Sequence, residues 1–355
     1  MSRTPRRQKQ LATISDVARR AGVSAMTVSR VINREANVRD ATRQVVEQAI
    51  AALNYAPNLA ARSLAGVRQL RIGLLYSNPS AGYLSEFLVG SLDQASRSAA
   101  QLVVEKCDIG DHEIEVARRL VDAGIDGIIL PPPLCDSEGV LAVLEESGTP
   151  AVVVATGRPR AGVLSVAIDD FAAALAMTDH ILSLGHRRIG FIAGNPNQTA
   201  SARRLEGYRA ALDRAGIAGD PELIAQGLFT YRSGLDAAEL LLDVGDPPTA
   251  IFAANDDMAA ATVAVAHRRG IDVPGDLTVC GFDDTTLATA IWPELTTIHQ
   301  PIADMSRIAV ETLVAAVREQ RSQSDPLGQV LDFTLIRRQS DATPRKRPRA
   351  ALISP

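Results

Sequence analysis

Apolar residues recur with helical spacing in the first part of the chain. Val17, Ala18 and Ala21 fall on one face of a predicted helix. Gly22 then interrupts the pattern. A second short helix follows, and its apolar face consists of Val28, Val31 and Ile32. The spacing therefore predicts two helices separated by a turn that contains glycine.

Capping residues mark where these helices begin. Thr13, with Asp16 three residues later, forms an acidic variant of the capping box, and Ser24 can cap the second helix. A third helix is predicted from about Asp40 to Leu53, with Asp40 as a candidate cap. Its apolar face consists of Val46, Ala49, Ile50 and Leu53. The three apolar faces together predict a small helical core.

The outward side of the second predicted helix has a composition suited to reading DNA. It carries Ala25, Met26, Ser29 and Arg30. These residues lie mainly on the first turn and a half, the part that a helix-turn-helix inserts into the major groove. Any helical hairpin can show such periodicity, an exposed Arg30 can be merely solvated, and Met26 can be a packing residue. The pattern indicates a DNA-reading element and leaves these alternatives open.

A short segment follows Pro57. Asn58 offers an N-cap and Gly66 a stop, with only about eight residues available for a helix. Because helix nucleation is costly, a helix this short is marginal in water, so we expect residues 58 to 65 to be largely unfolded without support. An Ala-rich linker is the alternative interpretation.

From Leu70 onward, short apolar runs alternate with helical stretches. The runs are residues 72–76, 102–104, 127–130, 151–154, 189–192, 250–253 and 277–280. Buried strands joined by helices form parallel sheets that are covered on both faces. Residues 70–160 and 165–290 each supply a set, which predicts an α/β fold with two doubly wound lobes. Because such lobes bind ligands at the carboxyl ends of their strands, we expect a cleft between them.

The formal charge of −4 conceals an uneven distribution along the 355 residues. Residues 1–68 hold twelve basic and four acidic side chains, a net charge of +8, which leaves −12 for the remainder. A basic N-terminal part suits a polyanion such as DNA, and an acidic body discourages DNA from binding elsewhere. Charge alone is weak support, since many tails are basic for no such reason.

Several classes of function have no sign in the sequence. The three cysteines lie far apart and are predicted to be reduced core thiols, and the five histidines lack metal-ligand spacing. We therefore expect no metal and no cofactor. No Gly-x-Gly-x-x-Gly, Walker-type loop, Gly-x-Ser-x-Gly elbow or His-Glu-x-x-His occurs, so nothing points to catalysis. No signal region or membrane-length segment is present, which predicts a cytoplasmic protein without a membrane partner.

Dense strings of residues carry a family resemblance. In the N-terminal part they are Asp16-Val17-Ala18, Ala21-Gly22-Val23-Ser24, Thr27-Val28-Ser29-Arg30-Val31-Ile32-Asn33, Thr42-Arg43, Leu53-Asn54-Tyr55-Ala56-Pro57-Asn58 and Ala60-Ala61-Arg62-Ser63-Leu64-Ala65-Gly66. In the body they are Leu184-Gly185-His186-Arg187-Arg188-Ile189, Ala254-Asn255-Asp256, Gly281-Phe282-Asp283-Asp284 and Leu295-Thr296-Thr297-Ile298. The chain resembles the LacI/GalR (lactose/galactose repressor) family of bacterial transcription regulators, whose effector domain is similar to periplasmic sugar-binding proteins.

The resemblance implies a set of DNA contacts. Ala25, Met26 and Arg30 would read base edges: an arginine can donate two hydrogen bonds to guanine, and the other two offer apolar contact to a thymine methyl group. The residues implied to lie near phosphates are Thr13, Ser24, Thr27, Ser29, Asn33 and Asn37. The segment from Asn58 to Gly66 would be a hinge helix that folds when two subunits pair over DNA, with Ala61 in the hinge. Leu64 would be the wedge between base pairs of the minor groove.

The resemblance also implies an effector site between the lobes. Arg204, Asn255 and Asp283 would make polar contacts, while Tyr83 and Phe229 would stack on the ligand and Trp292 would lie at the rim. A sugar needs a charged group for paired hydroxyls, an amide that donates and accepts, and aromatic faces. Two of these residues have alternatives, since Asp283 can cap a turn and Phe229 can belong to the core. The segment 77–80 departs from the family's usual string.

The expected organisation has five segments. They are a basic disordered arm (1–12), a helix-turn-helix headpiece (13–57), a hinge helix and linker (58–68), a two-lobed effector-binding and dimerisation domain (69–340) and a disordered basic tail (341–355). Crossovers between lobes are expected near residues 165–169, 297–301 and 328–331, and a last helix over about 301–320 would return to the first lobe. The tail lacks apolar heptads, so a homodimer is expected.

The sequence thus predicts a DNA-binding transcription regulator that recognises a pseudo-palindromic double-stranded operator. We expect it to act as a repressor. We expect a small molecule, a sugar or sugar derivative, to bind in the cleft and control the affinity for the operator. The protein would be associated with the nucleoid when bound to DNA. The alternatives are a solute-binding protein of the same two-lobed shape and an enzyme acting on a carbohydrate or nucleotide.

Overall fold

The computed structural model describes residues 12–32, 38–53, 55, 69–108, 110–319 and 327–345. The chain divides into two compact units, residues 1–69 and residues 70–355. The first unit is helical. It contains α1 (Ile14–Ala21), α2 (Ala25–Ile32) and α3 (Asp40–Leu53). These three helices match the predicted ones.

Local chemistry explains where the first helix begins and ends. Thr13 and Asp16 form the predicted capping box, and Gly22 ends α1 in the left-handed conformation, at φ 67°, that glycine adopts without steric cost. Val17, Val28 and Val46 are fully buried, one from each helix. A single apolar core therefore joins the three helices, as the periodicity predicts.

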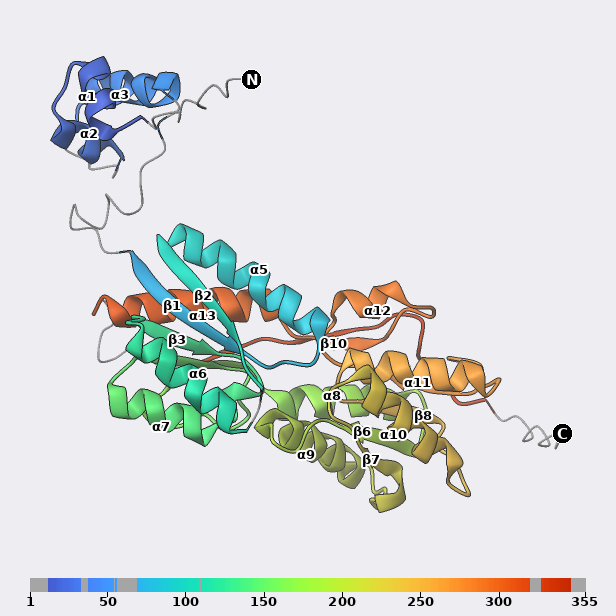
Figure 1. The fold of residues 1–355 in the computed structure, drawn as a ribbon. Coiled ribbons are helices and arrows are strands. Elements are labelled where there is room, and N and C mark those ends of the chain that lie inside the picture. Colours follow the sequence, from blue (N-terminus) through green and yellow to red (C-terminus); the bar gives the residue numbers. More distant parts are fainter. Residues whose placement is uncertain are drawn as a thin grey trace, which may run out of the picture. The chain divides into compact units, whose positions relative to one another are not determined.

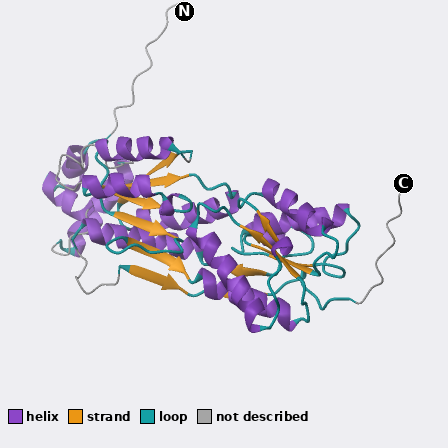
Figure 2. Ribbon diagram, turned by 90° about the horizontal axis from the view of Figure 1, so that it is seen from below, coloured by secondary structure: helices purple, strands orange, loops and turns teal. Residues whose placement is uncertain are grey.

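The second unit consists of two lobes, each with its own parallel sheet (Figures 1 and 2). In the first lobe the strand order is β11-β5-β4-β3-β1-β2. In chain order these strands are β1 (Leu70–Tyr76), β2 (Ala100–Lys106), β3 (Gly127–Leu130), β4 (Ala151–Val154), β5 (Leu164–Ile168) and β11 (Gly328–Leu331). Helices α5 (Ala81–Arg97) and α13 (Ile302–Val317) cover one face of the sheet, and α6 (Asp111–Asp122) and α7 (Glu138–Ser147) cover the other (Figure 1).

The second lobe repeats this plan with the strand order β7-β6-β8-β9. Its strands are β6 (Ile189–Ala193), β7 (Ile224–Gln226), β8 (Ala250–Ala253) and β9 (Thr278–Cys280). The helices α8 (Asp170–Ser183) and α9 (Thr199–Arg214) pack together, as do α10 (Tyr231–Asp243) and α11 (Asp256–Arg268). Short helices are η1 (Leu134–Asp136), η2 (Pro221–Leu223) and α12 (Thr286–Ala290). Two doubly wound lobes are thus present, as predicted.

Three segments cross between the lobes, the first two near the expected residues 165–169 and 297–301; the expected third, residues 328–331, forms strand β11 of the first lobe, and the chain crosses after it. The first follows β5, and the others contain the antiparallel pair of β10 (Thr297–His299) and β12 (Thr334–Ile336). Helix α13 packs against α5, which returns the chain to the first lobe. The expected strand runs did not include β5, β7, β10, β11 and β12. These strands have three to five residues, and in β5 the sequence Leu-Ser-Val-Ala-Ile lacks a continuous apolar run although all five residues are buried.

The expected disorder from residue 341 onward is wrong for the described residues 341–345. Asp341 is buried and its carboxylate accepts hydrogen bonds from Thr296 and Arg337 and pairs with His180 at 3.0 Å. The Ala342 carbonyl is 2.8 Å from Nε2 of His186. The basic composition of the segment did not predict these contacts, which hold it against the second lobe. Residues 346–355 lie outside the described part of the chain.

Two other expectations concern the whole chain. Cys107, Cys135 and Cys280 are free and buried, as predicted. Among the described residues, none of the helices combines the length and the apolar character needed to cross a membrane.

Candidate functional site

The outward surface of α2 is built by its cap and its buried side. Ser24 accepts a hydrogen bond from the backbone N–H of Thr27 at 3.1 Å, so it caps the helix as predicted. Val28 and Val31 face the core, whereas Ala25, Met26 and Arg30 are exposed. Met26 is 66% exposed, which excludes the alternative that it is a packing residue. A helix end with one polar and two apolar exposed side chains fits a groove that presents base edges and methyl groups.

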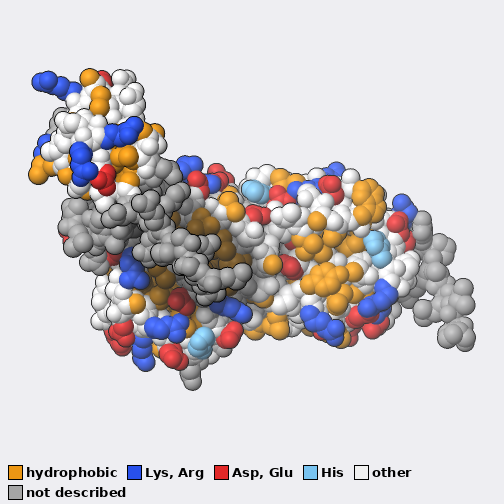
Figure 3. Space-filling model, turned by 45° about the horizontal axis from the view of Figure 1, so that its top comes forward, with side chains coloured by type: hydrophobic (Ala, Val, Ile, Leu, Met, Phe, Trp, Pro, Cys, Tyr) orange, Lys and Arg blue, Asp and Glu red, His pale blue; other side chains and the backbone are white. Residues whose placement is uncertain are grey.

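The residues expected near phosphates are only partly described. The Thr13 hydroxyl donates to Asp16 at 2.7 Å, and this bond contributes to lowering the pKa of the Asp16 carboxyl below its usual value. The hydroxyl of Ser24 lies 2.9 Å from that of Thr27. Figure 3 shows basic side chains spread over the surface of this helical unit. Five expected DNA contacts lie outside the described residues: Asn33, Asn37, Asn58, Ala61 and Leu64.

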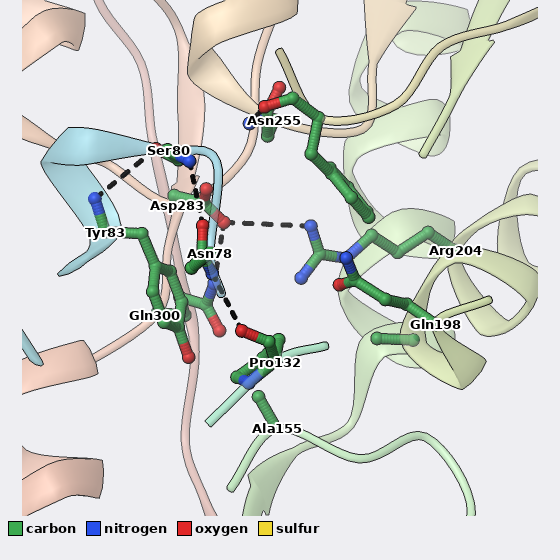
Figure 4. Close-up of a pocket in the computed structure, with 12 residues that line it drawn as sticks. Asn78, Ser80, Tyr83, Pro132, Ala155, Gln198, Arg204, Asn255, Asp283 and Gln300 are labelled. Carbon is green, nitrogen blue, oxygen red and sulfur yellow. Dashed lines mark hydrogen bonds and ion pairs between the residues drawn. The ribbon is translucent and has the colours of Figure 1, made fainter. Parts of the chain in front are cut away.

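A cleft lies where the carboxyl ends of the strands of both lobes meet (Figure 4). It is partly open to solvent. The residues that line it are Asn78, Ser80, Tyr83, Pro132, Ala155, Gln198, Ala200, Arg204, Phe229, Asn255, Asp283 and Gln300. Most of them closely follow a strand, which is where parallel α/β sheets bind ligands. Five of the six sequence-predicted effector residues therefore lie together: Tyr83, Arg204, Phe229, Asn255 and Asp283.

Arg204 is the central cation of the cleft. It is on α9, and its guanidinium points across the cleft toward Asp283 (Figure 4), with 3.7 Å between Nη1 and Oδ1. Nε donates to Asp170 at 2.7 Å and Nη1 donates to the Ala254 carbonyl at 2.5 Å. The guanidinium also lies 3.6 Å from the centroid of the Phe282 ring. The side chain is buried, and these partners both compensate its charge and hold the guanidinium in one orientation.

Asp283 is the acidic counterpart of Arg204. It follows β9 with a left-handed backbone at φ 108°, which is rare for a residue other than glycine. Gln300 donates to its Oδ1 at 2.6 Å. Burial raises the pKa of the Asp283 carboxyl well above its usual value, although Arg204 opposes the change. A ligand hydroxyl could donate to this carboxyl group and replace part of its lost hydration.

Asn255, Phe229 and Tyr83 have defined local roles. Asn255 caps α11 by accepting from the Met258 backbone N–H at 3.0 Å, and its amide donates to the Phe229 carbonyl at 3.2 Å. The Phe229 ring packs against Gly194, where a Cβ atom would lie only 1.9 Å from the ring. The Tyr83 ring is stacked on Phe87, and its buried hydroxyl group has no hydrogen-bond partner among the described residues. Phe229 and Tyr83 are thus core residues with an edge in the cleft.

Trp292, which was expected at the rim, is not among the residues that line the cleft. It is 74% exposed and follows α12, nine residues after Asp283. Along the chain, helix α12 lies between Trp292 and the loop that carries Asp283.

Seven residues that line the cleft were not predicted from the sequence: Asn78, Ser80, Pro132, Ala155, Gln198, Ala200 and Gln300. The available signal was their position, since Asn78, Pro132 and Ala155 follow predicted strands of the first lobe. Asn78 accepts from the Ser80 backbone N–H at 2.8 Å, and its amide donates to the Pro132 carbonyl at 3.3 Å. The loop after β1 is therefore tied to the loop after β3 beside the cleft (Figure 4).

Two sets of hydrogen bonds join the lobes at the cleft. On one side, the Ser80 hydroxyl of the first lobe donates to Asp257 of the second at 2.6 Å. On the other side, Asp136 of the first lobe accepts from the backbone N–H of Thr199 at 2.8 Å. Burial raises the pKa of the Asp257 carboxyl, and the hydrogen bond from Ser80 opposes this change. Both pairs require the lobes to be close together.

The chemistry of the cleft is that of binding. Within the described part of the chain, no group of three or more His, Cys, Asp or Glu side chains could hold a metal ion. The lining supplies a guanidinium, a carboxyl group, amides, hydroxyls and two aromatic edges. This is the set of groups that hydrogen-bonds to hydroxyls and packs against the apolar faces of a small polar ligand.

Comparisons with known proteins agree in both units. Residues 13–58 match the family model described as bacterial regulatory proteins, lacI family, and residues 178–340 match a periplasmic binding protein-like domain. Catabolite control protein A of Priestia megaterium is 34% identical over 88% of this chain and 94% of its own length. A transcriptional regulator CelR in complex with cellobiose is 33% identical, with a TM-score of 0.72 over 93% of this chain and 99% of that one. The Lac repressor dimer bound to operator and the anti-inducer ONPF is 29% identical, with a TM-score of 0.77 over 94% and 100% of the two chains.

Proposed function

The chain belongs to the lacI family of bacterial regulatory proteins, and from this membership we propose that a small molecule bound between its lobes controls its affinity for an operator. The protein is a DNA-binding transcription regulator, not an enzyme. The observation that carries the effector proposal is the meeting of Arg204 and Asp283 with aromatic edges in one interlobe cleft. As a regulator of transcription, it would work in the cytoplasm, on the nucleoid when DNA is bound.

The α2 surface is proposed to read the operator. Arg30 would donate to a guanine edge, and Ala25 and Met26 would contact thymine methyl groups. The proposed phosphate contacts are Thr13, Ser24, Thr27, Ser29, Asn33 and Asn37, as hydroxyls and amides commonly make them. Asn58, Ala61 and Leu64 are proposed to act in the minor groove. The exposure of Met26 and Arg30 and the cap at Ser24 support the first part of this proposal.

A homodimer would present two such units to a pseudo-palindromic site. We propose that a second copy of the chain covers exposed apolar side chains of the second unit, because a two-fold symmetric DNA site is bound by two DNA-binding units. Val89 and Leu92 on α5 are 62% and 55% exposed, and Trp292 near α12 is 74% exposed. Figure 3 shows apolar patches on the second lobe, on the face where α11 and α12 lie. Sedimentation of Leu92→Arg should show a shift from dimer toward monomer if α5 is in the interface.

The effector is proposed to be a sugar or a sugar derivative that binds better to one arrangement of the lobes than to the other. That difference in affinity limits how far DNA binding can change. The bonds from Ser80 to Asp257 and from Thr199 to Asp136 exist only when the lobes are close, so they would favour the closed arrangement. Lobe movement would change the position of α5 and of the hinge segments that precede the first lobe.

One experiment tests both parts of the proposal. Duplexes are selected from a random library with the full-length protein, and the affinity of the selected duplex is measured by fluorescence anisotropy with and without a panel of sugars. We expect a preferred, pseudo-palindromic sequence and a sugar that changes its affinity. No preference for any duplex at moderate ionic strength, under any sugar condition, would contradict the proposal. A preferred duplex with no response to any compound would leave DNA recognition and remove effector control.

A further inference from the structure

We propose that the cleft selects polyhydroxylated ligands that carry no anionic group and excludes phosphorylated and carboxylated ones. This inference rests on the proposed role of the cleft as the effector site. It follows from the charges that face the cleft and from the partners that these charges already have.

The cleft has little cationic capacity left for an anion. Among its described lining residues, Arg204 is the only basic group and Asp283 the only acidic group. Arg204 donates to the Asp170 carboxylate and to the Ala254 carbonyl, and it lies 3.7 Å from Asp283. The single guanidinium therefore interacts with two buried carboxyl groups, those of Asp170 and Asp283. An anionic ligand would have to compete with both, because burying an anion requires a paired cation.

Helix N-termini are the second common way to bind an anion, and those beside the cleft already have carboxylates. At α9, the backbone N–H of Thr199 donates to Asp136 at 2.8 Å. At α11, Asp256 and Asp257 occupy the first turn. At α5, the Ser80 cap donates its hydroxyl to Asp257. A phosphate placed here would lie close to these acidic groups.

The remaining groups of the cleft suit hydroxyls. The Tyr83 hydroxyl and Oε1 of Gln300 are buried and have no hydrogen-bond partner in the described part of the chain. A sugar hydroxyl can accept from the first and donate to the second. Asp283 can accept a further hydroxyl. Each unsatisfied buried group is costly, so a ligand that pairs them gains affinity without adding charge.

The test compares matched pairs of sugars by calorimetry and thermal unfolding of the full-length protein. The pairs are cellobiose and cellobiose 6-phosphate, glucose and glucose 6-phosphate, and ribose and ribose 5-phosphate. We expect a neutral member to bind and its phosphate to bind at least about tenfold more weakly, a difference of about 1.4 kcal/mol. Asp283→Ala should remove the binding of the neutral member.

A charge variant makes the test specific. Asp257→Asn removes a carboxylate from the first turn of α11, so the preference for the neutral member should narrow by about fivefold, the size expected for one charge at a helix N-terminus. Asp236→Asn makes the same change at an exposed position on α10 of the same lobe and should leave the preference unchanged. An equal effect of both variants would show a long-range charge effect and would overturn the assignment to the helix N-terminus.

The outcomes distinguish a failure of the selectivity for uncharged ligands from a failure of the proposed control by a sugar effector. A phosphate that binds more tightly than its neutral partner and changes operator affinity would overturn the inference and support effector control. If no member of any pair binds or changes operator affinity, both the inference and the proposal of a sugar effector are contradicted.

Discussion

The carboxylate of Asp136 joins the lobes by accepting two hydrogen bonds from Thr199, one from its backbone N–H at 2.8 Å and one from its hydroxyl at 2.9 Å. The Thr156 hydroxyl donates to the same carboxylate at 2.7 Å. The Thr199 hydroxyl also accepts from the Gly157 backbone N–H at 2.7 Å. Asp136 and Thr156 belong to the first lobe and Thr199 to the second, so this network exists only when the lobes are together.

Thr199→Val should weaken effector binding. Valine keeps the branched shape but loses the hydroxyl, so Asp136 and Gly157 lose a partner that is present only in the closed arrangement. These groups are only half-buried, so the loss of one hydrogen bond costs about 0.5 to 1.5 kcal/mol. We expect a loss of affinity of this size for a sugar that binds the wild type, measured by calorimetry. Thr199→Ser restores the hydroxyl and should restore affinity; equal affinities of all three proteins would exclude a role in closure.

Asp283→Ala should remove the effector response and leave DNA binding intact. The substitution takes away the carboxyl group that faces Arg204 and leaves the Gln300 amide without its 2.6 Å acceptor. Operator affinity is measured by fluorescence anisotropy with and without the sugar. Asp236→Asn, at an exposed position of the same lobe, is the control and should respond normally. A normal response of Asp283→Ala would remove this residue from the effector site.

The cleft was predictable where side chains follow strands that the sequence reveals. Arg204 was identified by its match to the family, and Asp283 and Asn255 stand in strings that follow clear apolar runs. Gln300 follows β10, a strand of three residues whose partner β12 lies more than thirty residues away in the chain. No local pattern reveals such a pairing. Trp292 was expected at the rim from the family resemblance. Its side chain is largely exposed to solvent, which depends on the fold and not on a local sequence pattern.

The C-terminal segment shows a second limit of sequence patterns. Asp341 has a charged side chain within a polar, basic stretch, which is typical of disorder. Its burial depends on Thr296 and His180, which are distant in the sequence. Composition records what a segment is made of and not which partners the fold brings to it. The three helices of the first unit were predictable because their caps and apolar faces are local.

Arg30→Ala should relax base preference. A bidentate arginine contact to guanine contributes about 1 to 3 kcal/mol of discrimination against other bases. We expect a loss of this size on the selected operator and a smaller loss on duplexes in which the contacted base pair is changed. Arg20→Ala removes an exposed arginine of α1 and serves as the control for the loss of charge. Unchanged selectivity of Arg30→Ala among duplexes would count against this residue as a reader of bases.

Leu64→Ala should separate specific from non-specific DNA binding. An apolar wedge unstacks a base step, and the bent duplex repays the cost with extra contacts only at a specific site. Non-specific association depends on charge and should keep its affinity and its dependence on salt. Both affinities are measured over a series of salt concentrations. Leu64→Met, which keeps a long apolar side chain, should retain most of the specific affinity. Equal losses for operator and unrelated duplexes in Leu64→Ala would contradict the wedge.

Asp256 predicts how stability depends on pH. Its buried carboxyl group accepts from the Thr297 hydroxyl at 2.7 Å and the Thr285 backbone N–H at 2.8 Å. Burial raises its pKa from 3.8 to about 7, although these hydrogen bonds oppose the change. Between these two values the folded protein holds a proton that the unfolded chain has released. The free energy of unfolding should therefore fall as pH rises from about 4 to about 7, by up to about 1.4 kcal/mol per pH unit.

Asp256→Asn tests this linkage, because a carboxamide has nearly the same shape and binds no proton in this range. The slope of the free energy of unfolding against pH, from urea titrations at several pH values between 4 and 8, should become smaller. Some slope should remain, because burial also raises the pKa of Asp170 and of Asp283 and both act with the same sign. Asp236→Asn should keep the wild-type slope. If Asp256→Asn keeps it as well, Asp256 is ionised in the folded protein throughout this range, and its hydrogen bonds outweigh the effect of burial.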